Sequence, residues 1–162
     1  HGLPPGALEL ELTENIALRQ DRVEMLAPLR QLRAWGVGIA FDDFGTGYAS
    51  LTTLQSFPVT RLKIDRSFIS GLPQDAHDAA IVEAVLELAR RFGLEVVAEG
   101  VESAAQEAFL AARGCGEGQG YLYGRPMPGA AFLAAAQAGA APGSTAPGRT
   151  APDRTELGPG GA

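Results

Sequence analysis

The chain has 162 residues, enough for about one ordinary domain with a real hydrophobic core. Hydrophobic residues make up 46% of it and charged residues 20%, and no apolar run approaches the ~20 residues that cross a bilayer, which excludes a membrane span in this stretch. A formal net charge of −6 argues against a broad surface for a DNA or RNA duplex, because such a surface clusters Lys and Arg, and an anionic substrate would need help from a metal.

Strand-like and helix-like segments alternate along the chain. Short apolar, β-prone runs predict strands at residues 7–12, 37–41, 60–64, 94–98 and, from a weaker pattern, 120–123. Apolar residues at helical spacing predict helices over residues 22–35, 50–57, 78–92 and 106–113. Strands and helices that alternate with short turns between them predict parallel βαβ units, and therefore an α/β fold.

The two ends of the chain differ from this alternating region. The first residue is His1 and no signal-peptide pattern follows it, so we expect a piece of a longer protein. From residue 137 onward Gly, Pro, Ala and Thr replace nearly every large apolar residue. Such a segment cannot offset its own ordering entropy, which predicts a disordered tail over residues 137–162 and a folded part over residues 1–136.

Acidic residues stand at the carboxyl ends of four predicted strands. They are Glu11, Asp42, Asp43, Asp65 and Glu99. In a parallel sheet these strand ends share one edge, and in a (β/α)₈ barrel that edge carries the active site. Converging carboxylates repel one another, so either their pKa values rise or cations neutralise them. We favour divalent hard cations.

Few other reactive groups are present. Cys115 is the only cysteine and cannot form an internal disulfide, which makes the cytoplasm the default compartment. His1 and His77 are the only histidines, so a histidine-rich zinc or iron site is excluded and a nucleophilic Ser or Cys is disfavoured. Any metal would be held by oxygen.

The residues around the acids leave several interpretations open. Asp42 and Asp43 precede a glycine-rich loop and suit two metal ions, while an Asp helix cap followed by a flexible turn fits the same pattern. Lys63 is the only lysine and lies on a predicted strand. Its ammonium would hold an attacking water or bind the charge of a phosphate. The alternative is an ordinary lysine whose side chain reaches solvent from the strand. Glu14 would cap a helix or tie down a loop. Gln119, between two glycines, is on its own read as structural.

Five segments together match one family in order and spacing. They are Glu11-Leu-Thr-Glu14, Asp42-Asp43-Phe-Gly-Thr-Gly47, Leu62-Lys63-Ile-Asp65, Ala98-Glu99-Gly-Val-Glu102 and Gln119-Gly-Tyr121. These motifs resemble the EAL-domain family of cyclic di-GMP phosphodiesterases. The resemblance implies a modified (β/α)₈ TIM-like barrel, here incomplete because its first strands are lacking. It also implies Mg²⁺ or Mn²⁺ at a two-metal site and hydrolysis of cyclic di-GMP to linear pGpG.

The resemblance implies a role for each matched residue. The metal ligands are Glu11, Asp42, Asp43 and Glu99, the catalytic set is Lys63, Glu99 and Glu14, and the substrate-supporting positions are Asp65, Gln119 and Glu102. Within these sets Lys63 would orient the attacking water. Glu14 would anchor the loop that follows Asp43.

The chain departs from the family pattern at two places. The Glu-Ala-Leu signature of the first barrel strand and an Asn ligand on the next strand both belong upstream of residue 1, and Gly116 stands where the family commonly has Asp. We therefore expect residues 1–136 to be the C-terminal part of an EAL domain that is inactive alone and active in its parent protein. The resemblance implies cyclic di-GMP as ligand, homodimers as a frequent state, and signalling domains upstream, through which the parent could be anchored to a membrane.

Two alternatives from other functional classes remain. A degenerate EAL domain would bind cyclic di-GMP or a partner protein as a sensor without cleaving it, and a non-acidic residue at the upstream signature position would favour it. A different metal-dependent barrel enzyme would share the acidic strand ends but bind no guanine dinucleotide.

Overall fold

Five parallel strands form one sheet in the order β1-β2-β3-β4-β5, so each strand lies beside the next one in the chain. The computed structural model describes residues 2–13, 16, 22–47 and 51–137. The strands are β1 (Glu9–Thr13), β2 (Gly38–Phe44), β3 (Arg61–Ile64), β4 (Glu95–Glu99) and β5 (Glu117–Gln119). The helices are α1 (Arg22–Ala34), α2 (Leu51–Ser56), α3 (Arg66–Ser70), α4 (Ala76–Phe92), α5 (Ala104–Ala112) and α6 (Gly129–Gln137), with a 3-10 turn, η1, at Pro5–Ala7.

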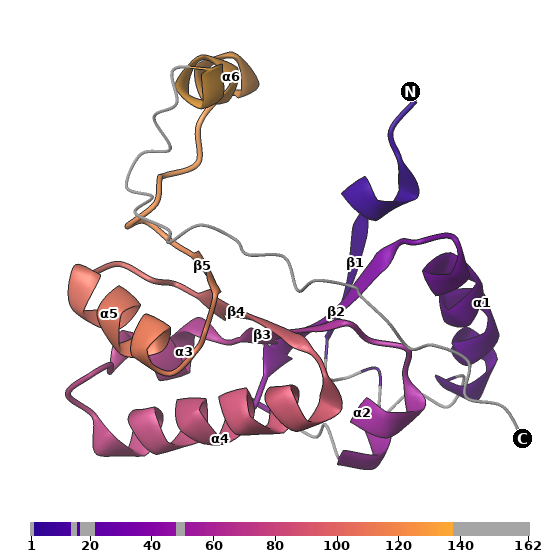
Figure 1. Cartoon of the computed structure of the whole chain (residues 1–162), viewed down its shortest axis with the longest axis horizontal. Coiled ribbons are helices and arrows are strands. Elements are labelled where there is room, and N and C mark those ends of the chain that lie inside the picture. The colour runs from indigo at the N-terminus through magenta and orange to yellow at the C-terminus, as the bar shows by residue number, and fades with distance from the viewer. Residues whose placement is uncertain (1, 14–15, 17–21, 48–50, 138–162) are drawn as a thin grey trace, which may run out of the picture.

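The sheet has an apolar face and a polar face. Successive side chains of a strand point to opposite faces, and the apolar set contacts the helices. Phe41 and Leu62 are fully buried on that face, and the Phe41 ring lies 5.8 Å from the ring of Phe57 just after α2. Figure 1 shows α4 running along the sheet, with α1 and α2 near β2 and α5 near β5. Parallel strands in chain order with helices between them form part of a TIM-like barrel wall, which confirms the predicted α/β fold.

The structure corrects the fifth predicted strand. Residues 120–123 form a turn, and β5 is the preceding segment Glu117–Gln119. The backbone of Gly120 packs directly on that of Val101, and the N–H of Leu122 donates to the carbonyl of Val101, so the chain bends away at this point. The apolar side chains at 120–123 suggested a strand. The contact of Gly120 with Val101 instead ends the pairing of β5 with β4 at Gln119, just before this segment begins.

Two helices were not expected from the sequence. Helix α3 has only five residues, too few to show a helical period. Apart from its last residue, helix α6 is built of Ala, Phe, Leu and Gly without an amphipathic pattern, and it stands apart from the sheet in Figure 1. Gln137, the first residue of the predicted tail, is the last residue of α6, whereas residues 138–162 lie outside the described part of the chain. None of the described helices is both long enough and apolar enough to cross a membrane.

Gly93 is the residue at which α4 ends. Its φ of 68° lies in the left-handed region, and a Cβ added there would meet no atom within 4 Å. Replacing Gly93 by alanine therefore adds backbone strain without a clash, and we expect it to lower the free energy of unfolding by about 1 kcal/mol in urea titrations. Gly116→Ala is the matched control, because its Cβ also meets open space and its φ is not positive. Equal stability of the two variants would contradict the argument.

Candidate active site

A buried lysine lies among three carboxylates at the carboxyl ends of the strands. The ammonium nitrogen of Lys63, on β3, is 2.6 Å from an oxygen of Glu11, 3.1 Å from one of Asp42 and 2.6 Å from one of Glu99. The Lys63 side chain is 8% exposed, which excludes the alternative of a lysine that reaches solvent. Although its burial favours the neutral amine, the hydrogen bonds to these carboxylates raise the pKa of Lys63 above its usual value. Lys63 is therefore a charged hydrogen-bond donor at neutral pH.

An irregularity in β2 brings two adjacent aspartates to one place. Neighbouring residues of a regular strand point to opposite faces, so Asp43 should point away from Asp42. Between Phe41 and Phe44 the register of β2 against β3 shifts by one residue, and Asp43 takes a φ of 55°. Its carbonyl accepts from the N–H and the hydroxyl of Thr46, which stabilises this uncommon conformation. The bulge thus turns Asp43 toward the same site as Asp42.

Three carboxylates are close enough to share a metal ion. Asp42, Asp43 and Glu99 each offer one oxygen, and these oxygens all lie within 4.8 Å of one another. Partial burial, followed by the nearby charges of Asp42 and Asp65, raises the pKa of Asp43 above its usual value. Carboxylate oxygens are the ligands that Mg²⁺ and Mn²⁺ prefer, and one ammonium does not neutralise this much negative charge. The donor set fits divalent hard cations. We call Lys63, Glu11, Asp42, Asp43 and Glu99 the carboxyl-end cluster.

Two of the other predicted site residues, Asp65 and Gln119, lie next to members of this cluster. Asp65 follows β3 and caps α3, because its side chain accepts a hydrogen bond from the N–H of Ser67 at 2.9 Å. Burial by itself would raise the pKa of Asp65, but the hydrogen bonds to Ser67 lower it below its usual value. Gln119 is the last residue of β5 and pairs in register with Glu99. The side chain of Glu102 is exposed in the loop after β4, where its N–H is bound by Gln106. The predicted role of Glu14 falls outside the described residues.

A second charged cluster lies at the other end of the same sheet face and was not expected. Arg61, two residues before Lys63, is 3.3 Å from Glu9, 2.5 Å from Glu95 and 3.3 Å from Glu117. We call these four residues the amino-end cluster, because each stands at the start of its strand. The sequence does contain a signal for this cluster. Glu9, Arg61 and Glu95 each precede a residue of the carboxyl-end cluster on the same strand by an even number of positions, and residues at even spacing on a strand share one face of the sheet.

A comparison with protein families identifies the fold. The family model described as the EAL domain matches residues 1–126. The chain belongs to the EAL domain family.

Known proteins similar to this EAL chain include enzymes and ligand complexes. The bifunctional diguanylate cyclase/cyclic di-GMP phosphodiesterase MucR of Pseudomonas aeruginosa is 53% identical over 135 residues, which are 83% of this chain and 20% of MucR. The chain thus spans about a fifth of that relative's length. A structure described as the PaMucR phosphodiesterase in complex with c-di-GMP matches with a TM-score of 0.75 and 52% identity, over 82% of this chain and 53% of the other.

Two further solved structures share the fold. The EAL domain of Mycobacterium smegmatis DcpA matches with a TM-score of 0.80 and 43% identity, over 85% of this chain and 61% of that one. A manganese and cy-diGMP complex of Klebsiella pneumoniae BlrP1 matches with a TM-score of 0.69 and 33% identity, over 77% of this chain and 32% of the other. These two likenesses confirm the TIM-like barrel family of the fold.

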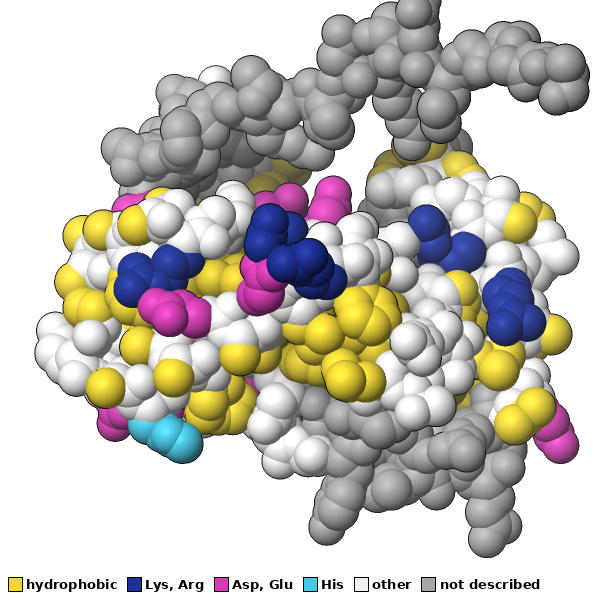
Figure 2. Space-filling view, turned by 60° about the horizontal axis from the view of Figure 1, so that its bottom comes forward, with side chains coloured by type: hydrophobic (Ala, Val, Ile, Leu, Met, Phe, Trp, Pro, Cys, Tyr) yellow, Lys and Arg dark blue, Asp and Glu magenta, His cyan; other side chains and the backbone are white. Residues whose placement is uncertain are grey.

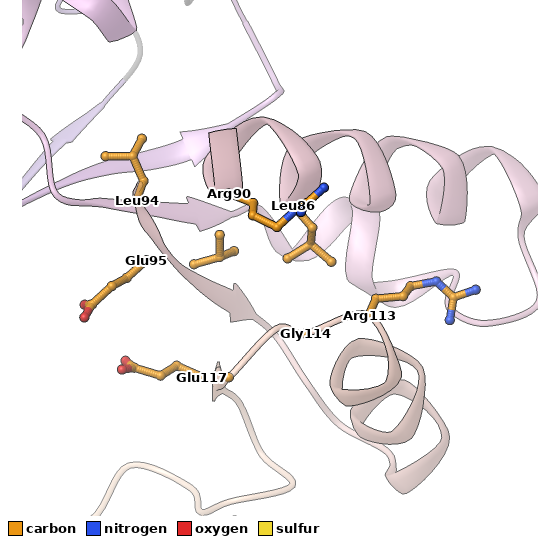
Figure 3. Close-up of a pocket in the computed structure, with 9 residues that line it drawn as sticks. Leu86, Arg90, Leu94, Glu95, Arg113, Gly114 and Glu117 are labelled. Carbon is orange, nitrogen blue, oxygen red and sulfur yellow. The ribbon is translucent and has the colours of Figure 1, made fainter. Parts of the chain in front are cut away.

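The EAL chain also has a surface pocket, which lies away from the carboxyl-end cluster. It has a volume of about 310 Å³ and lies between α4, which contributes Leu86, and the amino ends of β4 and β5, marked by Leu94 and Glu117 (Figure 3). Arg90, at its edge, is already paired with Glu87. In Figure 2, which brings the α4 side forward, several basic side chains likewise lie against acidic ones. Neither feature adds to the chemistry of the cluster.

Proposed function

We propose that the full-length protein containing this sequence hydrolyses cyclic di-GMP to linear pGpG with the help of Mg²⁺ or Mn²⁺. The observation that carries the proposal is the group of three carboxylates within 4.8 Å beside a buried lysine, at the strand ends of an EAL domain. Relatives support it, because MucR is described as a cyclic di-GMP phosphodiesterase and the BlrP1 structure holds manganese and cy-diGMP.

In this proposal the residues keep the roles that the family resemblance implies. Glu11, Asp42, Asp43 and Glu99 hold the metal ions, Lys63 and Glu14 complete the catalytic set with Glu99, and Asp65, Glu102 and Gln119 support the substrate. Among the four proposed metal ligands, Glu11 has the weakest support from the geometry. Its side chain is half exposed, and its contact with the cluster is the ion pair with Lys63. The bound metals would supply charge neutralisation for the phosphodiester and its leaving 3′ oxygen.

Lys63 acts as a donor and not as the base. Its ammonium is held by hydrogen bonds to carboxylates, which keep it protonated, so it cannot take a proton from water at neutral pH. In this structure its three N–H donors face Glu11, Asp42 and Glu99. Once bound metals had drawn one of these carboxylates away, the freed N–H would donate to the oxygen of the attacking water and direct that oxygen to the phosphorus. Attack breaks the bond to the 3′ oxygen, opens the cyclic dinucleotide and leaves a 5′ phosphate on linear pGpG. The departing 3′ oxygen takes up a proton to become the 3′ hydroxyl of pGpG, which balances the proton that the attacking water loses.

We further propose that residues 1–136 act as one part of a larger barrel. The chain covers 53% of the matched MucR phosphodiesterase chain and 61% of the matched DcpA chain. Metal ligands on the remaining strands would complete the site. On this proposal the 162 residues alone give no turnover.

Metal dependence is the direct test of the proposed reaction. We expect the full-length protein to convert cyclic di-GMP to pGpG with Mg²⁺ or Mn²⁺, to lose this activity in excess chelator, and to regain it when Mn²⁺ is restored. Chromatographic detection of pGpG checks the result, and the isolated 162-residue chain is assayed in parallel. Tight binding of cyclic di-GMP without any pGpG would instead indicate a sensor. Failure to bind guanine dinucleotides at all would indicate a different metal-dependent enzyme.

A further inference from the structure

The short helix α3 touches the loop that follows the two adjacent aspartates of β2. Gly45 lies two residues after Asp43, and a Cβ placed on it would be 2.9 Å from Cε2 of Phe68 in α3. The aromatic ring is therefore packed against the bare backbone of this loop. With a φ of 101°, Gly45 also holds a conformation that favours glycine. The ring of Phe68 thus limits how far the Asp42–Asp43 turn can move toward α3.

The same helix touches the loop that follows Glu99. A Cβ on Gly100, the next residue, would lie 2.6 Å from Cβ of Arg66 and 3.2 Å from its Cδ. The aliphatic stem of Arg66 is therefore pressed on the backbone of Gly100, whose φ is 71°. Arg66 and Phe68 are two positions apart on α3, so one short helix contacts the loops that directly follow the carboxylates of β2 and of β4.

Helix α3 is itself held in place at both ends. At its start the side chain of Asp65 accepts from the N–H of Ser67. Near its end Ile69 is fully buried, and its carbonyl accepts from Nε2 of the buried Gln106 at 3.0 Å. The Oε1 of Gln106 accepts from two backbone N–H groups of the loop after β4. These contacts make α3 a fixed support, since its position is set by the core and by α5.

We infer that Phe68 and the stem of Arg66 are positioning residues that hold the Asp42–Asp43 turn and Glu99 at the separation required to bind divalent cations. The inference rests on the proposed metal-dependent function, and it concerns residues outside the proposed metal-ligand, catalytic and substrate-supporting sets. Some residues orient the metal ligands without being ligands themselves. Their removal typically lowers metal affinity or activity by about 10–100-fold.

The test compares two phenylalanines of the full-length protein. Phe68 and Phe109 are both partly buried helical residues packed against the hydrophobic core, but Phe109 lies on α5 under Arg113. We expect Phe68→Ala to weaken Mn²⁺ binding, measured by electron paramagnetic resonance titration, by about 10-fold or more. It should lower kcat by a similar factor and change KM for cyclic di-GMP less than about threefold. Phe68→Leu should recover most of the Mn²⁺ affinity, because it restores apolar bulk below Gly45.

Phe109→Ala controls for a simple loss of stability. It should lower the melting temperature about as much as Phe68→Ala does while leaving Mn²⁺ affinity within about twofold of the wild type. Equal Mn²⁺ affinity in the Phe68→Ala and Phe109→Ala variants would overturn the inference. The proposed function fails separately, if the wild-type protein binds Mn²⁺ but releases no pGpG.

Discussion

Glu99→Gln is expected to reduce the hydrolysis of cyclic di-GMP by roughly 10³-fold, which corresponds to ~4 kcal/mol of lost transition-state stabilisation. The amide keeps the shape of the side chain but removes its charge. The substitution therefore weakens the binding of divalent cations by Asp42, Asp43 and residue 99. It also breaks the 2.6 Å ion pair between Glu99 and Lys63. Steady-state rates with saturating Mn²⁺, together with Mn²⁺ titration, measure both effects.

Glu95→Gln is the matched control for this change. Glu95 stands on the same strand and the same face as Glu99, at the opposite end, and is likewise ion-paired with a basic residue of β3. Its side chain is 62% exposed against 19% for Glu99, so its ion pair with Arg61 contributes little to stability. We expect hydrolysis by Glu95→Gln to stay within about twofold of the wild type. A similar loss in both variants would mean that the charge of the whole face, and not the carboxyl-end cluster, governs the reaction.

The location of the cluster could be predicted from the sequence because it depends on local patterns. Apolar runs gave four of the strands within a few residues of their bounds, and an acid at each strand end then had to lie on the same edge of a parallel sheet. For Lys63 the sequence left open both a role in the site and a side chain that reaches solvent, and its burial is a finding of the structure. The shared edge of the acidic strand ends required only strand periodicity and chain order.

The bulge in β2 and the support by α3 could not be predicted in this way. The register shift that turns Asp43 toward Asp42 depends on how β2 pairs with β3, about twenty residues away in the chain. The contacts of Phe68 with Gly45 and of Arg66 with Gly100 likewise join segments distant in sequence. The sequence shows only that glycine stands at positions 45 and 100, and nothing in it names the groups that these glycines contact. Tertiary packing decides these details.

Lys63→Met is expected to have opposite effects on metal-free stability and on the response to metal. Without divalent cations, Glu11, Asp42 and Glu99 lose the ammonium that neutralises them, and the free energy of unfolding should fall by about 3 kcal/mol. Half of the Glu11 side chain is exposed, which keeps the loss near the low end of the range for buried pairs. Because cations can replace the missing charge, Mn²⁺ should raise the melting temperature of the variant more than that of the wild type.

The same substitution should nearly abolish turnover, since methionine cannot donate a hydrogen bond to the attacking water; we expect kcat to fall by about 10²-fold or more. Arg61→Met is the control, because it removes the cation of the amino-end cluster from the same strand and face. Its partner carboxylates Glu9 and Glu117 are partly exposed, so stability should fall by only about 1 kcal/mol and turnover should persist. Full activity in Lys63→Met would show that the buried ammonium serves only to neutralise the carboxylates, and the water-orienting role would then pass to another residue of the complete barrel.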